Sequence, residues 1–239
     1  MWEFTGAKGM NGRSLRRALA VLLLTGIAGT WFACWAQDRR SESEWARRDT
    51  WQKPGEVMDA LGITAGSAVA DIGAGRGYFT MRLAERVGAN GRVYAVDIDE
   101  GNLSRLRERA ERENLKQVTT VASTTSEPKL EAESVNAIIV VNAYHEMRDY
   151  DSMMQGMFKG LKGCGLLGII DGEAPEGRTR ADYHSRHDIP ESLVREDAER
   201  AGFRFVGKKA TFRTGDNENW YFIVFEKPAA NCRSTAGAQ

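Results

Sequence analysis

The sequence VADIGAGRGY at residues 69–78 decides the fold of this chain. It begins with apolar residues typical of a buried strand, passes through Asp71, and enters a turn with Gly73, Gly75 and Gly77. Glycine tolerates the positive φ angles of such a turn and places no side chain between the backbone and a ligand. The N–H groups of the turn and of the helix that follows can therefore approach the polar groups of a ligand.

A second apolar run, Val93–Val96, ends in Asp97, 20 residues after Gly77. An acid at the tip of the second strand, about 20 residues past a glycine loop, binds the hydroxyl groups of a ribose in βαβ units. A dinucleotide fold would need G-x-G-x-x-G, and Tyr78 stands where its third glycine belongs. Asp71, just before the turn, would repel a pyrophosphate and suits a ligand with a cationic amino group.

The D-x-G-x-G-x-G pattern with its distal Asp97 resembles the first motif of the class I S-adenosylmethionine-dependent methyltransferases. The resemblance runs from about Trp51 to Lys227. Residues 201–203 (AGF) are similar to the family's step into strand six, and residues 161–165 (LKGCG) resemble its turn before strand five. The resemblance implies an α/β, Rossmann-like, doubly wound fold with a seven-stranded sheet in the order 3-2-1-4-5-7-6, strand seven being antiparallel.

The same resemblance implies S-adenosylmethionine as the cofactor. In the family the glycine loop passes under the amino-acid end of the cofactor, and the acid after strand two binds the ribose. One segment departs from the family's pattern. Directly after strand three the family often has an acid near the adenine amino group, whereas here residues 123–126 are STTS and Glu127 is the first acid. The adenine end is expected to be held by hydroxyls and backbone, or more weakly. The expected cofactor residues are Asp71, Gly73, Gly75, Gly77, Asp97, Ile98, Thr124 and Asn142.

Strands and helices alternate along the rest of the domain, as a doubly wound sheet requires. A helix at 53–61 is expected before the first strand, either as a lid over the cofactor or packed on the domain edge. The segment 172–188 is expected to be a polar loop. The expected strands are 68–72, 92–96, 117–122, 137–141, 166–170, 203–206 and 220–225, with helices at 78–87, around Leu103–Ala110, at 150–161 and from about 190 to 201.

The apolar strand at 137–141 delivers Asn142, Tyr144 and His145 to its carboxyl end, where ligands bind in open α/β sheets. Methyl transfer requires an aligned nucleophile, and a base only if the acceptor is protonated. These three residues are the candidate catalytic residues, with His145 as the candidate base. The alternative role of His145 is that of a structural hydrogen-bonding residue.

Composition narrows the choice of partners. Lysine plus arginine equals aspartate plus glutamate, at 33 each, so nothing indicates a nucleic-acid footprint. Three cysteines are too few and too scattered for a disulfide framework or a zinc site. His184 and His187, at i and i+3, offer two possible metal ligands without a matching carboxylate pattern. The sequence therefore predicts no metal and a small-molecule substrate.

The N-terminal segment carries a targeting pattern. Four basic residues between positions 8 and 17 precede 19 uncharged residues, Ala18–Ala36, which fits a signal peptide or a signal anchor just long enough to span a bilayer. The positive-inside rule then predicts an exported, periplasmic protein, or one anchored in the inner membrane through this segment and facing outward. The expected organisation is a signal or anchor at 1–36, a linker at 37–50, a methyltransferase domain at 51–228 and a disordered tail at 229–239.

The function predicted from the sequence is transfer of a methyl group from S-adenosylmethionine to a small molecule, by an enzyme of exported or membrane-anchored bacterial type. Two alternatives stay open. A nucleotide-dependent oxidoreductase is disfavoured by Asp71 and by the missing third glycine. A non-catalytic module that keeps the fold is favoured by the predicted location outside the cytoplasm, because S-adenosylmethionine is made in the cytoplasm. The altered segment at 123–126 favours it slightly as well. The sequence leaves the oligomeric state open.

Overall fold

The computed structural model describes residues 43–209, 213–214, 218–230 and 232. The predicted signal or anchor at 1–36 lies outside the described residues, as do the first residues of the predicted linker. Residues 43–52, which include the rest of that linker, are helical. The described residues from Asp49 onward form one compact unit.

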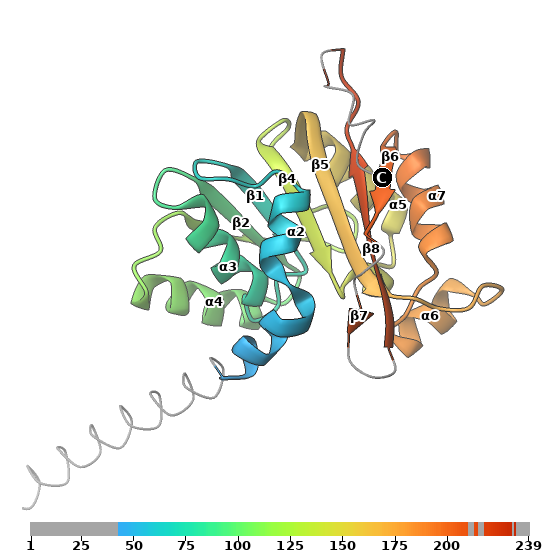
Figure 1. The fold of residues 1–239 in the computed structure, drawn as a ribbon, viewed down its shortest axis with the longest axis horizontal. Coiled ribbons are helices and arrows are strands. Elements are labelled where there is room, and N and C mark those ends of the chain that lie inside the picture. The colour runs from blue at the N-terminus through green and yellow to red at the C-terminus, as the bar shows by residue number, and fades with distance from the viewer. Residues whose placement is uncertain (1–42, 210–212, 215–217, 231, 233–239) are drawn as a thin grey trace, which may run out of the picture. The chain divides into compact units, whose positions relative to one another are not determined.

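The core of this unit is a mostly parallel sheet of the order β3-β2-β1-β4-β5-β8-β6, with the short β7 paired to β8 (Figure 1). Strand β8 is antiparallel to both of its main neighbours, β5 and β6. Since β8 corresponds to strand seven of the methyltransferase family, the predicted order 3-2-1-4-5-7-6 is confirmed. The strands are β1 (Ala68–Ile72), β2 (Arg92–Asp97), β3 (Val118–Ala122), β4 (Val135–Val141), β5 (Leu161–Gly172), β6 (Arg204–Lys208), β7 (Arg213–Thr214) and β8 (Glu218–Glu226).

Helices cover both faces of the sheet. Figure 1 shows α2 and α3 in front of the strands and α5 behind them. Strand β4 lies between β1 and β5, and its residues from Ala137 to Val140 are almost fully buried, as expected for a strand covered on both faces. The helices are α2 (Pro54–Ala60), α3 (Tyr78–Val87), α4 (Glu100–Arg112), η1 (Tyr144–Glu146), α5 (Tyr150–Gly160), α6 (Arg180–Arg186) and α7 (Glu191–Arg200).

The polar segment between β5 and α7 is not the loop that the sequence predicted. It contains α6, whose start is fixed by a capping box: the Thr179 side chain accepts from the Asp182 backbone N–H, and the Asp182 carboxylate accepts from the Thr179 N–H. Its C-cap is His187 in the left-handed conformation, with φ 57°. This short helix therefore fixes the position of His187 relative to the sheet.

The predicted turn at 162–165 lies inside a strand. Strand β5 already begins at Leu161, which pairs with Val135, and the register then shifts so that Leu166 pairs with Ala137. The residues between form a bulge in which Cys164 has φ 63°. Cys164 is disulfide-bonded to Cys232, so this part of the predicted disordered tail is covalently fixed to the sheet.

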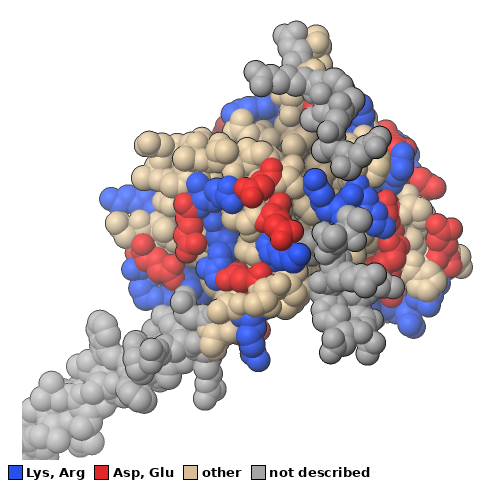
Figure 2. All heavy atoms as spheres, in the orientation of Figure 1, with Lys and Arg blue, Asp and Glu red and all other residues tan. Residues whose placement is uncertain are grey.

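The face of the unit seen in Figure 2 carries charges of both signs next to one another. On α3, Arg82 pairs with Asp49 at 2.8 Å and Arg86 pairs with Asp59 at 2.7 Å. The exposed Arg86–Asp59 pair contributes little to stability, about 0–1 kcal/mol. Both pairs keep α3 aligned with the segments before β1, while the opposite side of α3 packs on the sheet.

Candidate active site

The glycine turn between β1 and α3 is shaped by close packing at two of its three glycines. A Cβ atom on Gly73 would lie 2.4 Å from the Cβ atom of Ala143, and one on Gly77 would lie 2.9 Å from Leu106 Cδ1. Both residues also have positive φ angles, 75° and 84°. Gly75, in contrast, has no atom within 4 Å of its Cβ position. The open side of the turn is therefore at Gly75, where a ligand can approach the backbone.

Asp97, at the end of β2, joins the second strand to this turn. Its Oδ2 accepts a hydrogen bond from the Gly75 N–H at 2.7 Å, and its Oδ1 accepts from the Asp99 N–H at 2.8 Å. The carboxylate is nearly buried and lines a cavity at the carboxyl end of the sheet. A carboxylate has about four acceptor positions, so Asp97 keeps capacity for hydroxyl donors of a ligand.

Asp71 has a different environment from the one predicted for it. Its side chain is 2% exposed and accepts a hydrogen bond from Thr80 Oγ1 at 2.6 Å. It lies beneath the turn, and it is not among the residues that line the cavity. In the structure this acid joins the end of β1 to α3 through its hydrogen bond with Thr80.

The cavity has a volume of about 550 Å³, which is in the usual range for a small-molecule site. It contains six of the predicted site residues and leaves out four, namely Asp71, Gly77, Tyr144 and His145. Its lining residues are Ile72, Gly73, Gly75, Asp97, Ile98, Asp99, Asn102, Ser123, Thr124, Thr125, Asn142, Ala143, Glu146, Met147, Arg148 and Met153.

One end of the cavity, beside β2 and β3, combines an apolar side chain with hydroxyl groups. Ile98 is 60% exposed although it is a large aliphatic residue, and exposed apolar residues in a cavity favour contact with a flat, apolar ligand surface. The hydroxyl-bearing segment Ser123–Thr125 faces the same space, whereas Glu127 does not line it. The Thr124 N–H donates to the Glu127 carbonyl at 3.0 Å, which closes this segment into a tight loop.

The other end of the cavity is formed by the chain after β4. Asn142 adopts φ 53°, a left-handed conformation that asparagine tolerates better than most residues. This turn feeds η1, and the result is that Asn142 and Glu146 line the cavity while Tyr144 and His145 point into the protein. The sequence placed Asn142, Tyr144 and His145 together at the sheet edge, and the turn divides them between two environments.

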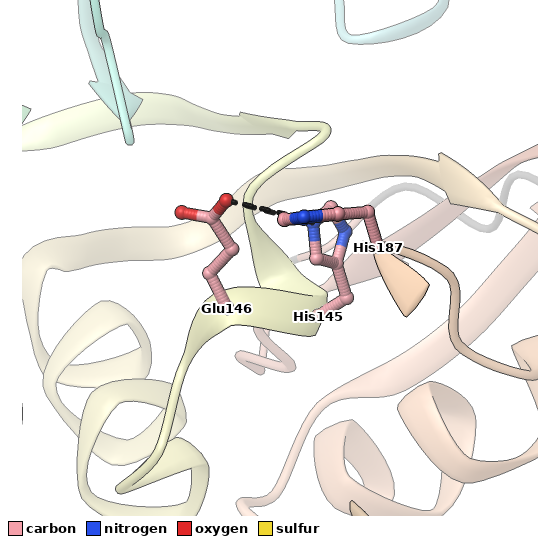
Figure 3. A group of neighbouring side chains, drawn as sticks. All are labelled: His145, Glu146 and His187. Atoms are coloured by element: carbon pink, nitrogen blue, oxygen red, sulfur yellow. Dashed lines mark hydrogen bonds and ion pairs between the residues drawn. The ribbon is translucent and has the colours of Figure 1, made fainter. Parts of the chain in front are cut away.

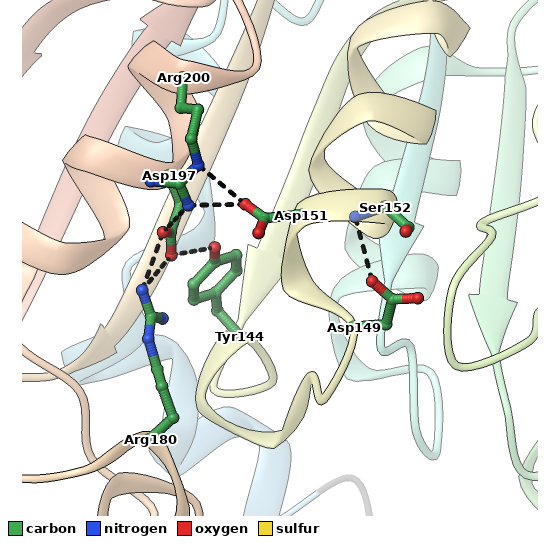
Figure 4. A network of polar contacts seen from close by, with 7 residues as sticks. All are labelled: Tyr144, Asp149, Asp151, Ser152, Arg180, Asp197 and Arg200. Atoms are coloured by element: carbon green, nitrogen blue, oxygen red, sulfur yellow. Dashed lines mark hydrogen bonds and ion pairs between the residues drawn. The ribbon is translucent and has the colours of Figure 1, made fainter.

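Tyr144 belongs to a polar network around the buried Asp197 (Figure 4). Its hydroxyl donates to Asp197 Oδ2 at 2.8 Å, and Asp197 also accepts from Arg180 and Arg200. Burial, followed by the nearby charge of Asp197, raises the pKa of Tyr144 well above its usual value. The side chain therefore stays protonated and ties η1 to α6 and α7, and it makes no contact with the cavity.

His145 is held by a second buried acid, Asp171, at the carboxyl end of β5. The Asp171 Oδ1 lies 2.7 Å from His145 Nδ1, and its Oδ2 accepts from the His145 backbone N–H at 3.1 Å. Both side chains are 0% exposed. Burial lowers the pKa of His145, but the hydrogen bond and charge of Asp171 and the charge of Glu146 raise it more, so the net shift is upward.

Sequence reasoning missed several residues of this site. Asp99 and Asn102 line the cavity from the start of α4, and Asp99 is the N-cap of that helix, a role readable from an acid just before a helical pattern. Asp171 comes directly after the predicted strand 166–170, and no role was predicted for it. Its position at the carboxyl end of a strand could have indicated a functional role, since functional groups gather at that edge of parallel sheets.

Comparisons with known proteins relate part of the chain to methyltransferases. Residues 69–165 match the methyltransferase domain family. The chain is 24% identical over 129 residues to a demethylmenaquinone methyltransferase of Oceanobacillus iheyensis, covering 54% of this chain and 53% of the relative. A demethylmenaquinone methyltransferase of Bacillus mycoides is 26% identical over 129 residues, with 54% of each chain covered. The chain thus spans about half the length of the curated relatives it matches.

Solved structures show the same fold. A methyltransferase from Aquifex aeolicus, described as dependent on S-adenosylmethionine, superposes with a TM-score of 0.62 at 23% identity, covering 72% of this chain and 88% of that one. A putative sarcosine dimethylglycine methyltransferase from Galdieria sulphuraria gives a TM-score of 0.63 at 17% identity, covering 77% and 86%. Residues 69–165, which carry the glycine turn, Asp97 and β4, thus match a methyltransferase domain, and the solved methyltransferases share the fold of the sheet.

Proposed function

We propose that the protein binds S-adenosylmethionine in the cavity and transfers its methyl group to a small-molecule acceptor. The observation that carries this proposal is the bond between the Gly75 N–H and Asp97, which holds an acid at the mouth of an open glycine turn. The relatives support a small-molecule acceptor, since one is named for demethylmenaquinone and another for sarcosine and dimethylglycine.

The residues present fit this cofactor. A Cβ atom on Gly75 would occupy the open side of the turn, so glycine there leaves room for the amino-acid end of the ligand. Asp97 and Asp99 offer carboxylate oxygens to ribose hydroxyls, and Ile98 offers an apolar surface to a flat base. Thr124 and its neighbours supply hydroxyls in place of the family's acid. The bound cofactor supplies an activated methyl group, so the protein has mainly to align the acceptor.

The acceptor end of the cavity is lined by Asn142, Glu146, Met147 and Arg148. A general base must lie within hydrogen-bond reach of the proton it removes. Among these lining residues, Glu146 is the side chain that can accept a proton from an acceptor. His145 lies behind it, with Nε2 3.8 Å from Glu146 Oε1. We therefore assign Asn142 and Glu146 to the acceptor, and we assign no direct proton removal to His145, whose buried ring faces Asp171.

The test of the cofactor site is calorimetric titration of S-adenosylmethionine into the parent protein and into Asp97→Ala. Loss of a charged hydrogen-bonding group should weaken binding by roughly 10- to 150-fold, or about 1.5–3 kcal/mol. Asp59→Ala is the matched control, because Asp59 is an exposed acid on α2 paired only at the surface with Arg86. Its affinity should equal that of the parent protein.

The same titration separates the alternatives. No binding by the folded parent protein would rule out the methyltransferase proposal, and binding of a nicotinamide dinucleotide in its place would favour an oxidoreductase. Parent-level affinity in Asp97→Ala would remove Asp97 from the site. Tight S-adenosylmethionine binding without turnover, across a screen of phenols, amines, thiols and carboxylates, would favour a non-catalytic module.

We further propose that the domain works outside the cytoplasm. The basic and apolar pattern of residues 1–36 supports export, and so does the Cys164–Cys232 disulfide, because disulfides persist mainly in oxidising compartments. Of the residues that the structure describes, none belongs to a helix with the length and apolar character needed to cross a bilayer. An anchoring role is thus proposed only for the N-terminal segment outside the described residues.

The export proposal predicts the behaviour of a fusion protein. Residues 1–50 joined to a reporter that is active only outside the cytoplasm should give signal, since the basic residues are retained inside and the chain after Ala36 is delivered outward. The matched control replaces Leu22, Leu23 and Leu24 with charged residues and should give none. Activity of the parent fusion confined to a cytoplasmic reporter would contradict the proposal.

A further inference from the structure

Three side chains converge beside the acceptor end of the cavity. His145 and Glu146 come from η1, and His187 comes from the C-cap of α6 (Figure 3). His145 Nε2 lies 3.3 Å from His187 Nδ1 and 3.8 Å from Glu146 Oε1, and His187 Nδ1 lies 3.6 Å from the same oxygen. Each of the three residues thus offers one nitrogen or oxygen atom to a common point.

These separations suit a metal ion better than direct hydrogen bonds. A nitrogen–oxygen hydrogen bond spans about 2.7–3.2 Å, so the carboxylate of Glu146 is too far from both rings to bond to either. Ligand atoms about 2.0–2.1 Å from a tetrahedral zinc ion lie about 3.3–3.4 Å apart. Around an octahedral ion with similar bond lengths, adjacent ligands lie about 3.0 Å apart. The three measured distances are closer to the tetrahedral value.

The ring of His145 is already oriented as a metal ligand would be. Its Nδ1 faces Asp171 Oδ1 at 2.7 Å, and in the tautomer that donates from Nδ1 to this carboxylate the lone pair of Nε2 points toward His187 and Glu146. This carboxylate–histidine arrangement is the common way in which proteins fix the tautomer of a metal-binding histidine. Asp188 adds further negative charge near the His145 ring.

We propose that His145 Nε2, His187 Nδ1 and Glu146 Oε1 bind one divalent transition-metal ion of the zinc type. Two imidazoles and one carboxylate are ligands that such ions prefer, whereas Mg²⁺ and Ca²⁺ select oxygen ligands. Three protein ligands leave the fourth position open. Because Glu146 also lines the cavity, the open position adjoins the acceptor end, where it can take an anionic oxygen, sulfur or nitrogen atom.

The proposal explains a feature that methyl transfer alone does not need. All three histidines of the chain lie between residues 145 and 187, and the two that η1 and α6 bring together are 42 residues apart in the sequence. The remaining one, His184, has a buried Nδ1 without a hydrogen-bond partner and is not part of the group of ligands. His184 is therefore an internal control for non-specific binding to imidazole.

The experiment uses the full chain, freed of any affinity tag, in a Cys34→Ser background so that this thiol does not bind metal. After treatment with a chelator, Zn²⁺ is titrated by calorimetry and Co²⁺ by its visible absorption. The protein should bind one equivalent of Zn²⁺, and bound Co²⁺ should show the intense bands of a tetrahedral site. Zinc should also raise the melting temperature.

Two variants test the ligands. His187→Asn removes an imidazole that is 67% exposed and keeps a residue that tolerates the left-handed φ of 57° at this position, so the fold should persist. Glu146→Gln keeps the shape of its side chain. Each should weaken zinc binding by at least about 100-fold, since loss of even an outer-shell partner costs roughly 10- to 100-fold. His184→Gln should bind zinc as the parent does.

Absence of stoichiometric zinc binding in the parent, or retention of parent affinity in either His187→Asn or Glu146→Gln, would overturn the proposal. Melting curves without metal check that each variant is folded, and His187→Gly replaces His187→Asn if that variant is not. The inference does not depend on methyl transfer: S-adenosylmethionine binding is measured on the same metal-free samples, and His187→Asn should bind it as the parent does. Failure of the metal site and failure of the cofactor site are therefore separate results.

Discussion

His145→Ala is expected to lower the free energy of unfolding by about 3–5 kcal/mol, the usual cost of removing one member of a buried charged or hydrogen-bonded pair. The reason is the environment of Asp171, whose carboxylate is fully buried. Its Oδ1 faces His145 Nδ1 at 2.7 Å and accepts from the Gly172 N–H at 2.8 Å. Without the imidazole, this oxygen loses its side-chain partner and faces an empty space that the alanine leaves.

The measurement is denaturant unfolding of metal-free protein, together with cofactor affinity and turnover on the same preparation. His145→Asn is the conservative variant, because its amide N–H can still donate toward Asp171, and it should recover part of the lost stability. If His145 were instead the base, the alanine variant would keep its stability and its cofactor affinity. It would then lose only turnover, by roughly 10²–10⁴ on an acceptor that must lose a proton.

The parallel half of the sheet could be predicted from the sequence because its signals are local. A continuous apolar run gave β4, and a glycine turn between an apolar strand and a helix gave β1 and α3 with the residues observed at their ends. The predicted start of β5 at residue 166 was wrong, because the strand begins at Leu161. Residues 162–165 have the composition of a turn, which hid the earlier start. Leu161 and Leu166, on either side of these residues, both pair with β4, and the residues between them form a bulge within the strand, which is a tertiary effect.

In the candidate site, too, the features with local sequence signals were predicted and those that depend on distant residues were not. Asp97 and the glycine turn were predicted because Asp97 follows Gly77 by 20 residues, a spacing typical of one βαβ unit. The environment of His145 was not, because it depends on Asp171 and His187, which are 26 and 42 residues away. No periodicity links such positions. They meet because β5 ends beside β4 and because α6 is folded where the sequence suggested a loop.

The second large effect concerns the Cys164–Cys232 disulfide, which joins the bulge of β5 to the chain after β8. The two cysteines are 68 residues apart, and closing a loop of this length stabilises the folded state by about 4 kcal/mol in the chain-entropy model. We therefore expect the double variant Cys164→Ser, Cys232→Ser to unfold with a free energy about 4 kcal/mol lower than that of the oxidised parent. Its melting temperature should be lower by roughly 8–16 °C.

The control is Cys34→Ser, which should melt as the parent does because Cys34 takes no part in this disulfide. Thiol titration of unfolded, unreduced protein should find one free cysteine of the three in the chain, and three would contradict the disulfide. Equal stability of the double variant and the oxidised parent would contradict the expected contribution. Protein made in a reducing cytoplasm should resemble the double variant and gain the missing stability on oxidation. The folded domain would then be at full stability only in an oxidising compartment, which is the destination that the N-terminal segment predicts.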